Sequence, residues 1–584
     1  MKRFFNGFGI LLMAVSLVAA AGCSKKKGAD TTNTGSAKAK ADLKNILEKP
    51  LITLKSIPSD AFYVFANLAP QPKQVVNDFL KSMAPAIDKG IDQFEKMKDL
   101  PISGVPNAKI KNQHAAVDLL KAFLHEFKGK YSIEGLEKLG LKMDGGFALY
   151  GLGVMPVMRF QISDKTLMAG TIQRVLKNGK VNFKKEKFQN MEYWRIDLDK
   201  DDIIAVGLTD KEAVLGLVPI KSKDKMLGLM FDSKKIKKSM ADDNKLAEIA
   251  RDYGFLPYSI GFVDFQAIAA ALLGDSKGMS TDLLKLVEVK IPPDAQKPEC
   301  KAEIKDLVSN MKRLVVGVDK LSSTNVSMRY VVETKPKLIK ELKDLASSGP
   351  GFSTPKDQNN LFAFSVNMNV SKLFATIKAR VQEAKAKPYK CSLLAELNKS
   401  AQSVNMSMAT LIPPVVNSIT GAAAVLESIT PGPKGMPLGG KGYVLVGSSN
   451  PLQLIMILQG MLPQLAGLQV KMGGGPVSIP AAALPPFLKD AKLDIQKTYV
   501  AAYVGRKSPP SIPNGRNGTE KVLFHIGYNM DEITKLINTM TPGKMEKPNP
   551  AGILDYTDIA VLVNDKGIVI KTAMKFNNNN TKAK

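Results

Sequence analysis

Histidine and serine are the residue types most able to carry catalysis in this chain, and their spacing argues against it. The three histidines are His114, His125 and His525. His125 lacks the second histidine at helical spacing that a zinc protease needs, and His525 lies inside an alternating strand pattern. The serines at 448 and 449 lack the flanking glycines of a nucleophile elbow and fit a helix cap. We therefore predict no catalytic residue and no metal ligand, and expect a protein that is not an enzyme.

A run of carboxylates from Asp197 to Asp202 begins like a calcium-binding loop. The match stops at the sixth position, which is Asp202 instead of glycine, and at the twelfth, which is Leu208 instead of a bidentate glutamate. In a strand, Asp197 and Asp199 would share one face and Trp194 would lie on the other, so we favour a solvated hairpin over a core. The glycine-rich pieces 439–442 and 473–475 follow neither phosphate-binding nor dinucleotide-binding spacing. No cofactor is expected.

The first residues have the layout of an export signal. A basic start, Met1-Lys2-Arg3, precedes an apolar stretch from Phe8 to Ala21, and small residues stand immediately before Cys23. The apolar stretch is shorter than the roughly 20 residues that span a bilayer, which argues against an uncleaved anchor. An ordinary cleaved signal with an incidental cysteine is the other alternative.

The residues Ala20-Ala21-Gly22-Cys23 resemble the lipobox of bacterial lipoproteins, although Ala20 stands where that family favours leucine. The resemblance implies that Cys23 carries lipid and becomes the first residue of the mature protein. It also implies sorting to the outer membrane, because Ser24 is not aspartate. We therefore expect lipid anchoring there through Cys23, with the mature domains facing the periplasm or the cell surface.

Two further cysteines, Cys300 and Cys391, remain for other uses. Disulfides form and persist in the compartments that an export signal leads to. A bond between these two would close a loop of about 90 residues, for which chain entropy gives an upper figure of roughly 4 to 5 kcal/mol. Two separate buried thiols are the alternative.

Length and composition predict a folded protein of more than one domain. The chain has 584 residues, of which 45% are hydrophobic and 23% charged, and single cores seldom grow past about 250 to 300 residues. The formal net charge of +28 favours anionic neighbours. Behind an export signal these would be a lipid or another anionic envelope component, and no nucleic acid. Lysines spread over solvated helix faces are the simpler interpretation, and the one that we favour.

One pattern recurs along the mature chain: a short alternating strand, a capping residue and then an amphipathic helix. Three copies fall before residue 350 and three after it, and each half ends in a predicted hairpin. The order of the patterns is the same in both halves, so we infer a tandem duplication. The strands of the six copies are predicted at residues 62–67, 157–162, 258–263, 361–366, 443–446 and 522–526.

The expected fold class is α+β, with two tandem duplicated halves, each a mostly antiparallel sheet with helices packed on one face. Many predicted strands lie too close in sequence for the crossovers that a parallel sheet requires. The predicted parts are a signal peptide at 1–22, a flexible tether at 23–49, a first domain at 50–346, a linker at 347–360, a second domain at 361–576 and a disordered tail at 577–584.

The segment from Gly442 to Val470 contains no charged residue. The start signal Asn450-Pro451 divides it into a strand and a helix, and polar residues interrupt any membrane span. A buried helix is the simplest interpretation; a helix that lines an apolar cavity or lies against lipid is the alternative, aided by Met456 and Met461. The expected function is a non-catalytic binding or structural module of the envelope, in a sharper version a carrier for a hydrophobic ligand. An envelope hydrolase with a dispersed site is the alternative.

Overall fold

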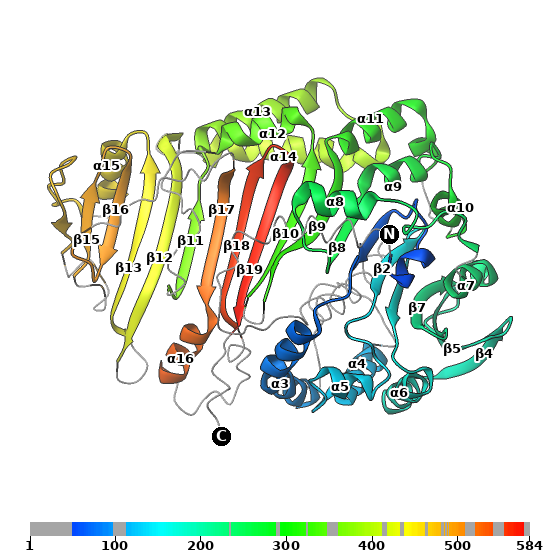
Figure 1. Cartoon of the computed structure of the whole chain (residues 1–584). Coiled ribbons are helices and arrows are strands. Elements are labelled where there is room, and N and C mark those ends of the chain that lie inside the picture. The colour runs from blue at the N-terminus through cyan, green and yellow to red at the C-terminus, as the bar shows by residue number, and fades with distance from the viewer. Residues whose placement is uncertain are drawn as a thin grey trace. The chain divides into compact units, whose positions relative to one another are not determined.

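The chain consists of two compact units in which antiparallel strands alternate with helices (Figure 1). The computed structural model describes residues 50–96, 113–232, 235–287, 292–322, 325–346, 360–411, 417–432, 437–461, 465–480, 484, 488, 490–508, 520–540 and 554–576. Unit 1 comprises residues 1–291, 313–328 and 576–584, and unit 2 comprises residues 292–312 and 329–575. Cys23, the predicted signal peptide, tether and tail, and nearly all of the predicted linker lie outside the described residues.

Unit 1 is built on an antiparallel sheet with β3 at its middle. Its strands are β1 (Tyr63–Ala66), β2 (Phe147–Leu152), β3 (Met155–Gln161), β4 (Phe183–Phe188), β5 (Met191–Asp197), β6 (Asp202–Leu208), β7 (Glu212–Pro219), β8 (Ile260–Asp264) and β9 (Met311–Leu321). Their pairings give the order β4-β5-β6-β7-β3-β2-β1-β8-β9, and each pairing is antiparallel. The short connections expected of hairpins are therefore present, for example between β2 and β3.

Helices contact both faces of this sheet. They are α3 (Lys73–Lys96), α4 (Gln113–Phe127), α5 (Ile133–Glu137), α6 (Lys165–Asn178), α7 (Lys223–Phe231), α8 (Lys245–Tyr253), α9 (Phe265–Leu272) and α10 (Met279–Lys285). Met168 of α6 packs with Phe160 of β3, whereas Met230 of α7 approaches Gly216 of β7. Because Phe160 pairs with Ala213, Gly216 points to the opposite face. The prediction of helices on one face is not confirmed.

A buried ion pair lies in the core of unit 1. Arg159 of β3 is 1% exposed, and its Nη1 donates to Glu212 Oε2 of β7 at 2.8 Å. Its Nε donates to Tyr150 Oη of β2 at 3.0 Å, and its Nη2 donates to the carbonyl oxygen of Met230. The guanidinium thus has partners from two neighbouring strands and a helix, as a buried charge requires.

Unit 2 is built on a second antiparallel sheet, in which β11 lies between β12 and β17. Its strands are β11 (Phe362–Val366), β12 (Ile419–Pro431), β13 (Pro437–Ser448), β14 (Val477–Ser478), β15 (Lys492–Ile495), β16 (Tyr499–Val504), β17 (Lys521–Asn529), β18 (Leu554–Asn564) and β19 (Gly567–Phe576). The pairings give the order β14-β15-β16-β13-β12-β11-β17-β18. The last strand, β19, pairs with β10 (Asn325–Thr334), which carries residues of both units.

The helices of unit 2 are α11 (Pro298–Ser309), α12 (Pro336–Leu345), α13 (Val370–Ala386), α14 (Ala395–Leu411), α15 (Pro451–Met461) and α16 (Met530–Met540). Leu454 and Ile455 of α15 pack on Leu493 and Ile495 of β15 and on Val500 of β16. A second cluster, with Leu445 and Tyr503, lies on the other face of the sheet.

The mixed fold of helices and antiparallel strands agrees with the predicted class, but the division of the chain differs from the predicted one. Residues 292–312 and 329–346, assigned to the first domain in the sequence analysis, lie in unit 2. They include α11 and α12, which pack with later segments of the chain. Within the described residues, no helix combines the length and the apolar character needed to cross a bilayer.

Candidate functional site

A buried polar cluster lies on one face of the unit 2 sheet. It consists of Ser365 on β11, His525 on β17, and Tyr556 and Asp558 on β18, and we call it the His525 cluster. Ser365 and His525 are direct partners in the strand register, so their side chains share a face. Asp558 is opposite Gly527, and its Oδ2 lies 2.6 Å from His525 Nε2. Three strands therefore bring together a hydroxyl, an imidazole and a carboxylate.

The burial of this cluster limits its chemistry. Ser365 and His525 are both 0% exposed. Ser365 Oγ and His525 Nδ1 have no hydrogen-bond partner within the described part of the chain. Burial, and after it the charge of Asp558, raises the pKa of Tyr556 above its ordinary value. The imidazole and carboxylate could exchange a proton, but a nucleophile must also reach a substrate.

Sequence reasoning assigned no role to His525 and did not foresee this cluster. The alternating pattern placed His525 in a strand, as observed. Its partners come from strands distant in sequence, and pairing register is not written in a local pattern. A glycine two residues later was the available hint: a Cβ at Gly527 would lie 2.1 Å from Tyr556 Oη, so glycine is needed for the tyrosine to fit.

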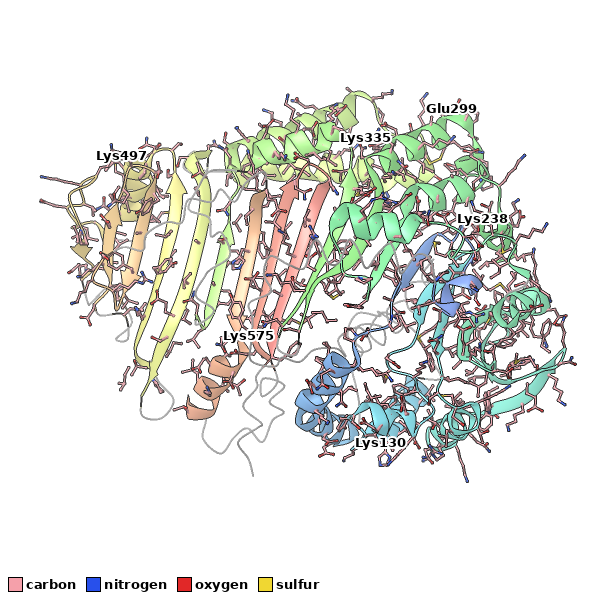
Figure 2. The ribbon with its side chains drawn as sticks, in the orientation of Figure 1. Lys130, Lys238, Glu299, Lys335, Lys497 and Lys575 are labelled. Atoms are coloured by element: carbon pink, nitrogen blue, oxygen red, sulfur yellow. A yellow bond between two sulfur atoms is a disulfide. The ribbon has the colours of Figure 1, made fainter. Side chains whose placement is uncertain are left out.

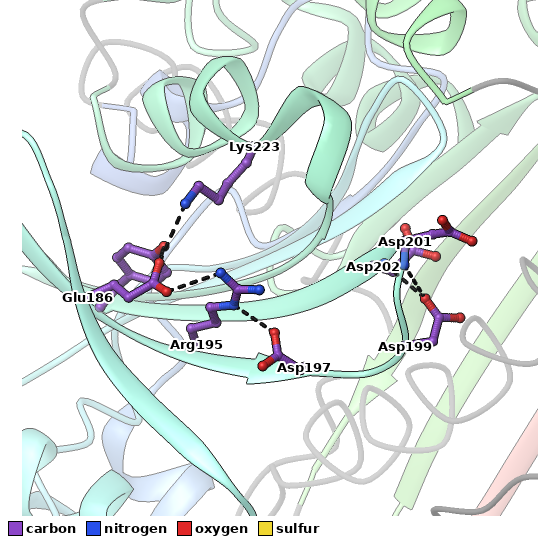
Figure 3. A network of polar contacts seen from close by, with 8 residues as sticks. Glu186, Arg195, Asp197, Asp199, Asp201, Asp202 and Lys223 are labelled. Carbon is purple, nitrogen blue, oxygen red and sulfur yellow. Dashed lines mark hydrogen bonds and ion pairs between the residues drawn. The ribbon is translucent and has the colours of Figure 1, made fainter.

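The acidic run of unit 1 forms a hairpin in which Asp197 and Asp199 are hydrogen-bonded to neighbouring groups (Figure 3). Asp199 Oδ1 accepts hydrogen bonds from the backbone nitrogens of Asp201 and Asp202 at 2.8 and 3.0 Å, which shapes the turn between β5 and β6. Arg195 Nε donates to Asp197 at 2.7 Å. The opposite face of β5 carries Trp194 into the core, as the sequence predicted. This arrangement matches the solvated hairpin that we favoured over a calcium loop.

Beside that hairpin, Glu186 of β4 is surrounded by donors. Arg195 Nη1 donates to its carboxylate at 3.1 Å, Lys223 Nζ lies 3.5 Å away, and Tyr193 Oη donates to it as well. The hydrogen bond from Tyr193 is the largest cause that holds the pKa of Glu186 below its ordinary value, and the two cations add to it. The carboxylate is thus engaged within the protein.

Cys300 and Cys391, the pair considered in the sequence analysis, are joined by a disulfide in unit 2 with their Cα atoms 4.5 Å apart. Glu303 of α11 accepts hydrogen bonds from the backbone nitrogens of Lys390 and Cys391, each at 3.0 Å. Asp294 accepts from the backbone nitrogen and the hydroxyl of Ser392, and the hydroxyl contact is the largest cause that lowers its pKa. Two carboxylates and one covalent bond therefore hold the segment that follows α13.

The disulfide lies beside a carboxylate, so this part of unit 2 also contains potential metal ligands. Among the described residues, the side chains that converge closely enough to hold an ion are those of Asp294, Cys300 and Cys391. The two sulfurs are bonded to each other and Asp294 is engaged by Ser392, so this group does not fit a metal in its oxidised form.

The uncharged segment forms the end of β13 and helix α15. Asn450 Oδ1 accepts from the backbone nitrogen of Gln453 at 3.2 Å, so the predicted cap is confirmed, and the helix begins at Pro451. Only one side of α15 is buried. Met456 and Met461 are 70% and 72% exposed, and Leu452 is also exposed. The simple expectation of a buried helix is wrong for this outer side, which faces away from the core.

No protein-family model matches the chain, and no curated protein and no solved structure matches it either.

Proposed function

We propose that this protein is a bacterial envelope lipoprotein, held on the outer membrane through acylated Cys23, that acts by binding or as a structural module and not by catalysis. The proposed export and lipid anchoring are supported by the basic start, the apolar stretch and the residues Ala20-Ala21-Gly22-Cys23. The mature units would face the periplasm or the cell surface. Their partner would be a lipid or another anionic envelope component, which the net charge of +28 favours.

The observation that carries the binding role is the exposed apolar surface of unit 2. Most of the large apolar side chains that are exposed in the described residues belong to this unit, among them Leu438, Val444, Met456 and Met461. We infer from this enrichment that unit 2 contacts an apolar partner or a membrane, the usual role of apolar surface that a folded protein leaves exposed. A hydrophobic ligand held on this surface is the sharper version of the proposal.

Tandem duplication is part of the proposal, and strand order supports it. In unit 1, β1 lies between β2 and β8, and β3 joins β2 to β7. In unit 2, β11 lies between β12 and β17, and β13 joins β12 to β16. Helices α6 and α15 follow the corresponding strands β3 and β13, and α9 and α16 follow β8 and β17. Each unit would then descend from one ancestral α+β domain.

An envelope hydrolase is the second candidate. The juxtaposition of Ser365, His525 and Asp558 favours it, because these residue types form the nucleophile, base and orienting acid of many acyl-transfer enzymes. The complete burial of Ser365 and His525 favours the non-catalytic role proposed above.

Labelling with palmitate and native mass spectrometry test the main proposal together. We expect labelled palmitate to enter the protein in cells and to be absent from Cys23→Ser, because the sulfur is the acceptor. Protein purified from cells should also retain phospholipid mass on its folded units. A protein without palmitate, equal in this respect to its serine variant, would refute the envelope assignment.

A further inference from the structure

The outer side of α15 is an apolar row without charge. Leu452, Met456 and Gly460 follow at intervals of four residues and are all exposed, and Met461 adjoins Gly460 at the end of the helix. The inner side is occupied, because Leu454 and Ile455 pack on strands β15 and β16. The exposed row is therefore the solvent-facing side of a helix whose opposite side is packed in the core.

Lysines predominate in the segments around this row, and Asp490 and Asp494 are the first carboxylates that follow it in the chain. No aspartate or glutamate occurs between Glu427 and Asp490, whereas the same stretch contains several lysines. Lys471 is exposed next to exposed Met472, and the backbone nitrogen of Gly473 donates to Ile495 at 2.9 Å, which ties that loop to β15. Lys497 lies in the turn after β15, beside α15 (Figure 2), where Thr498 accepts a hydrogen bond from Ser448 just before the helix.

We propose that this surface, formed by α15 with Lys471, Met472 and Lys497 and called here the α15 tip, rests on an anionic phospholipid surface. Met456 and Met461 would enter the headgroup region while the lysines contact lipid phosphates, as in helices that lie in a membrane interface. The inference rests on the proposed envelope location and adds a second membrane contact to the acyl anchor. A second copy of the chain is a poorer occupant, because it would bring the same positive charge to the contact.

The test places a fluorescent side chain on the tip. Met456→Trp adds an indole on the exposed row, and the single native tryptophan, Trp194, is 6% exposed and gives a constant background measured on the unmodified protein. Full-length lipidated protein is mixed with vesicles that carry brominated acyl chains, made either with phosphatidylglycerol or with phosphatidylcholine alone. Leu167→Trp is the matched control, since Leu167 is 46% exposed on α6 of unit 1.

With phosphatidylglycerol, the indole at 456 should be quenched at least roughly twofold more than the indole at 167, and less in phosphatidylcholine. Raising the salt to about 1 M, where the Debye length falls to about 3 Å, should weaken the difference. Equal quenching at the two positions would overturn the inference. The inference would also be overturned if, without vesicles, the indole at 456 were protected from quenching by aqueous iodide and sedimentation showed dimers. A second copy of the chain would then cover the tip.

Flotation of the same samples separates this inference from the proposed function. Vesicle-bound protein whose indole at 456 is not quenched would refute the tip contact and leave the anchor in place. Quenching in anionic vesicles by protein that carries no palmitate would refute the anchor and support the tip contact.

Discussion

Replacing Glu212 with glutamine should leave the guanidinium of Arg159 buried without its counter-charge. Arg159 keeps its contacts with Tyr150 and with the Met230 carbonyl, but these are neutral groups. Because water cannot reach a side chain that is 1% exposed, the lost carboxylate is not replaced by solvent. The substitution keeps the size of the side chain nearly unchanged, so electrostatics dominate the result.

Breaking one side of a buried ion pair costs about 3 to 5 kcal/mol of unfolding free energy, whereas replacing both partners with apolar residues is often neutral or stabilising. We therefore expect Glu212→Gln to be severely destabilised and the double variant Arg159→Met with Glu212→Leu to recover most of the loss. Glu192→Gln is the matched control. Glu192 is exposed and lies 3.7 Å from exposed Lys187, and such surface pairs contribute about 0 to 1 kcal/mol.

Urea unfolding followed by tryptophan emission measures these differences, because Trp194 is the only tryptophan of the chain and lies in the core of unit 1. With a slope of about 2 to 3 kcal/mol per molar urea, the midpoint of Glu212→Gln should fall by roughly 1 to 2 M. A loss as small as that of Glu192→Gln, or a double variant no more stable than the single one, would refute the argument.

Two further predictions concern the disulfide and the Glu186 network. Replacing Cys300 and Cys391 with serine should lower the unfolding free energy of unit 2 by up to roughly 4 to 5 kcal/mol. Hydrogen exchange of the backbone amides should become faster in unit 2 and stay unchanged in unit 1. Wild-type protein in a reductant should show the same change. Because the folded pKa of Glu186 is lowered, its contribution is present above the pKa of the unfolded chain and is lost as the pH falls through the folded value. Glu186→Gln should therefore be less stable than wild type at pH 7, and this difference should disappear at a pH well below 4; a pH-independent difference would contradict it.

Local features of the fold were accessible from the sequence because they depend on neighbours in the chain. The recurring pattern predicts a capping residue before each helix. Asp164, Asp264 and Asn369 have this role, because each accepts a hydrogen bond from the backbone nitrogen three residues later. Proline at the first position of α15 was read correctly for the same reason. Strand alternation likewise placed Trp194 in the core and the aspartates outside.

Features that depend on distant pairing were not accessible. Burial of Arg159 follows from three strands and a helix that meet around it, and an arginine in a strand pattern is normally assigned to solvent. The division of the chain was missed for a related reason. Residues 292–312 precede the predicted linker by a long stretch, yet Glu303 and Cys300 bind the segment at 390 and 391. The hydrophobic periodicity of either segment gives no information about this contact.

Pairing of distant strands also explains why the His525 cluster escaped prediction. The burial of the cluster leads to a test that separates the two candidate functions. Ser365 Oγ has no hydrogen-bond partner among the described residues, and an unsatisfied buried hydroxyl costs about 1 to 3 kcal/mol. Ser365→Ala should therefore be as stable as wild type or more stable in denaturant unfolding, with lipid retention unchanged. If wild type hydrolyses ester substrates and both Ser365→Ala and His525→Ala abolish this while remaining folded, the cluster is catalytic and the binding-only proposal fails.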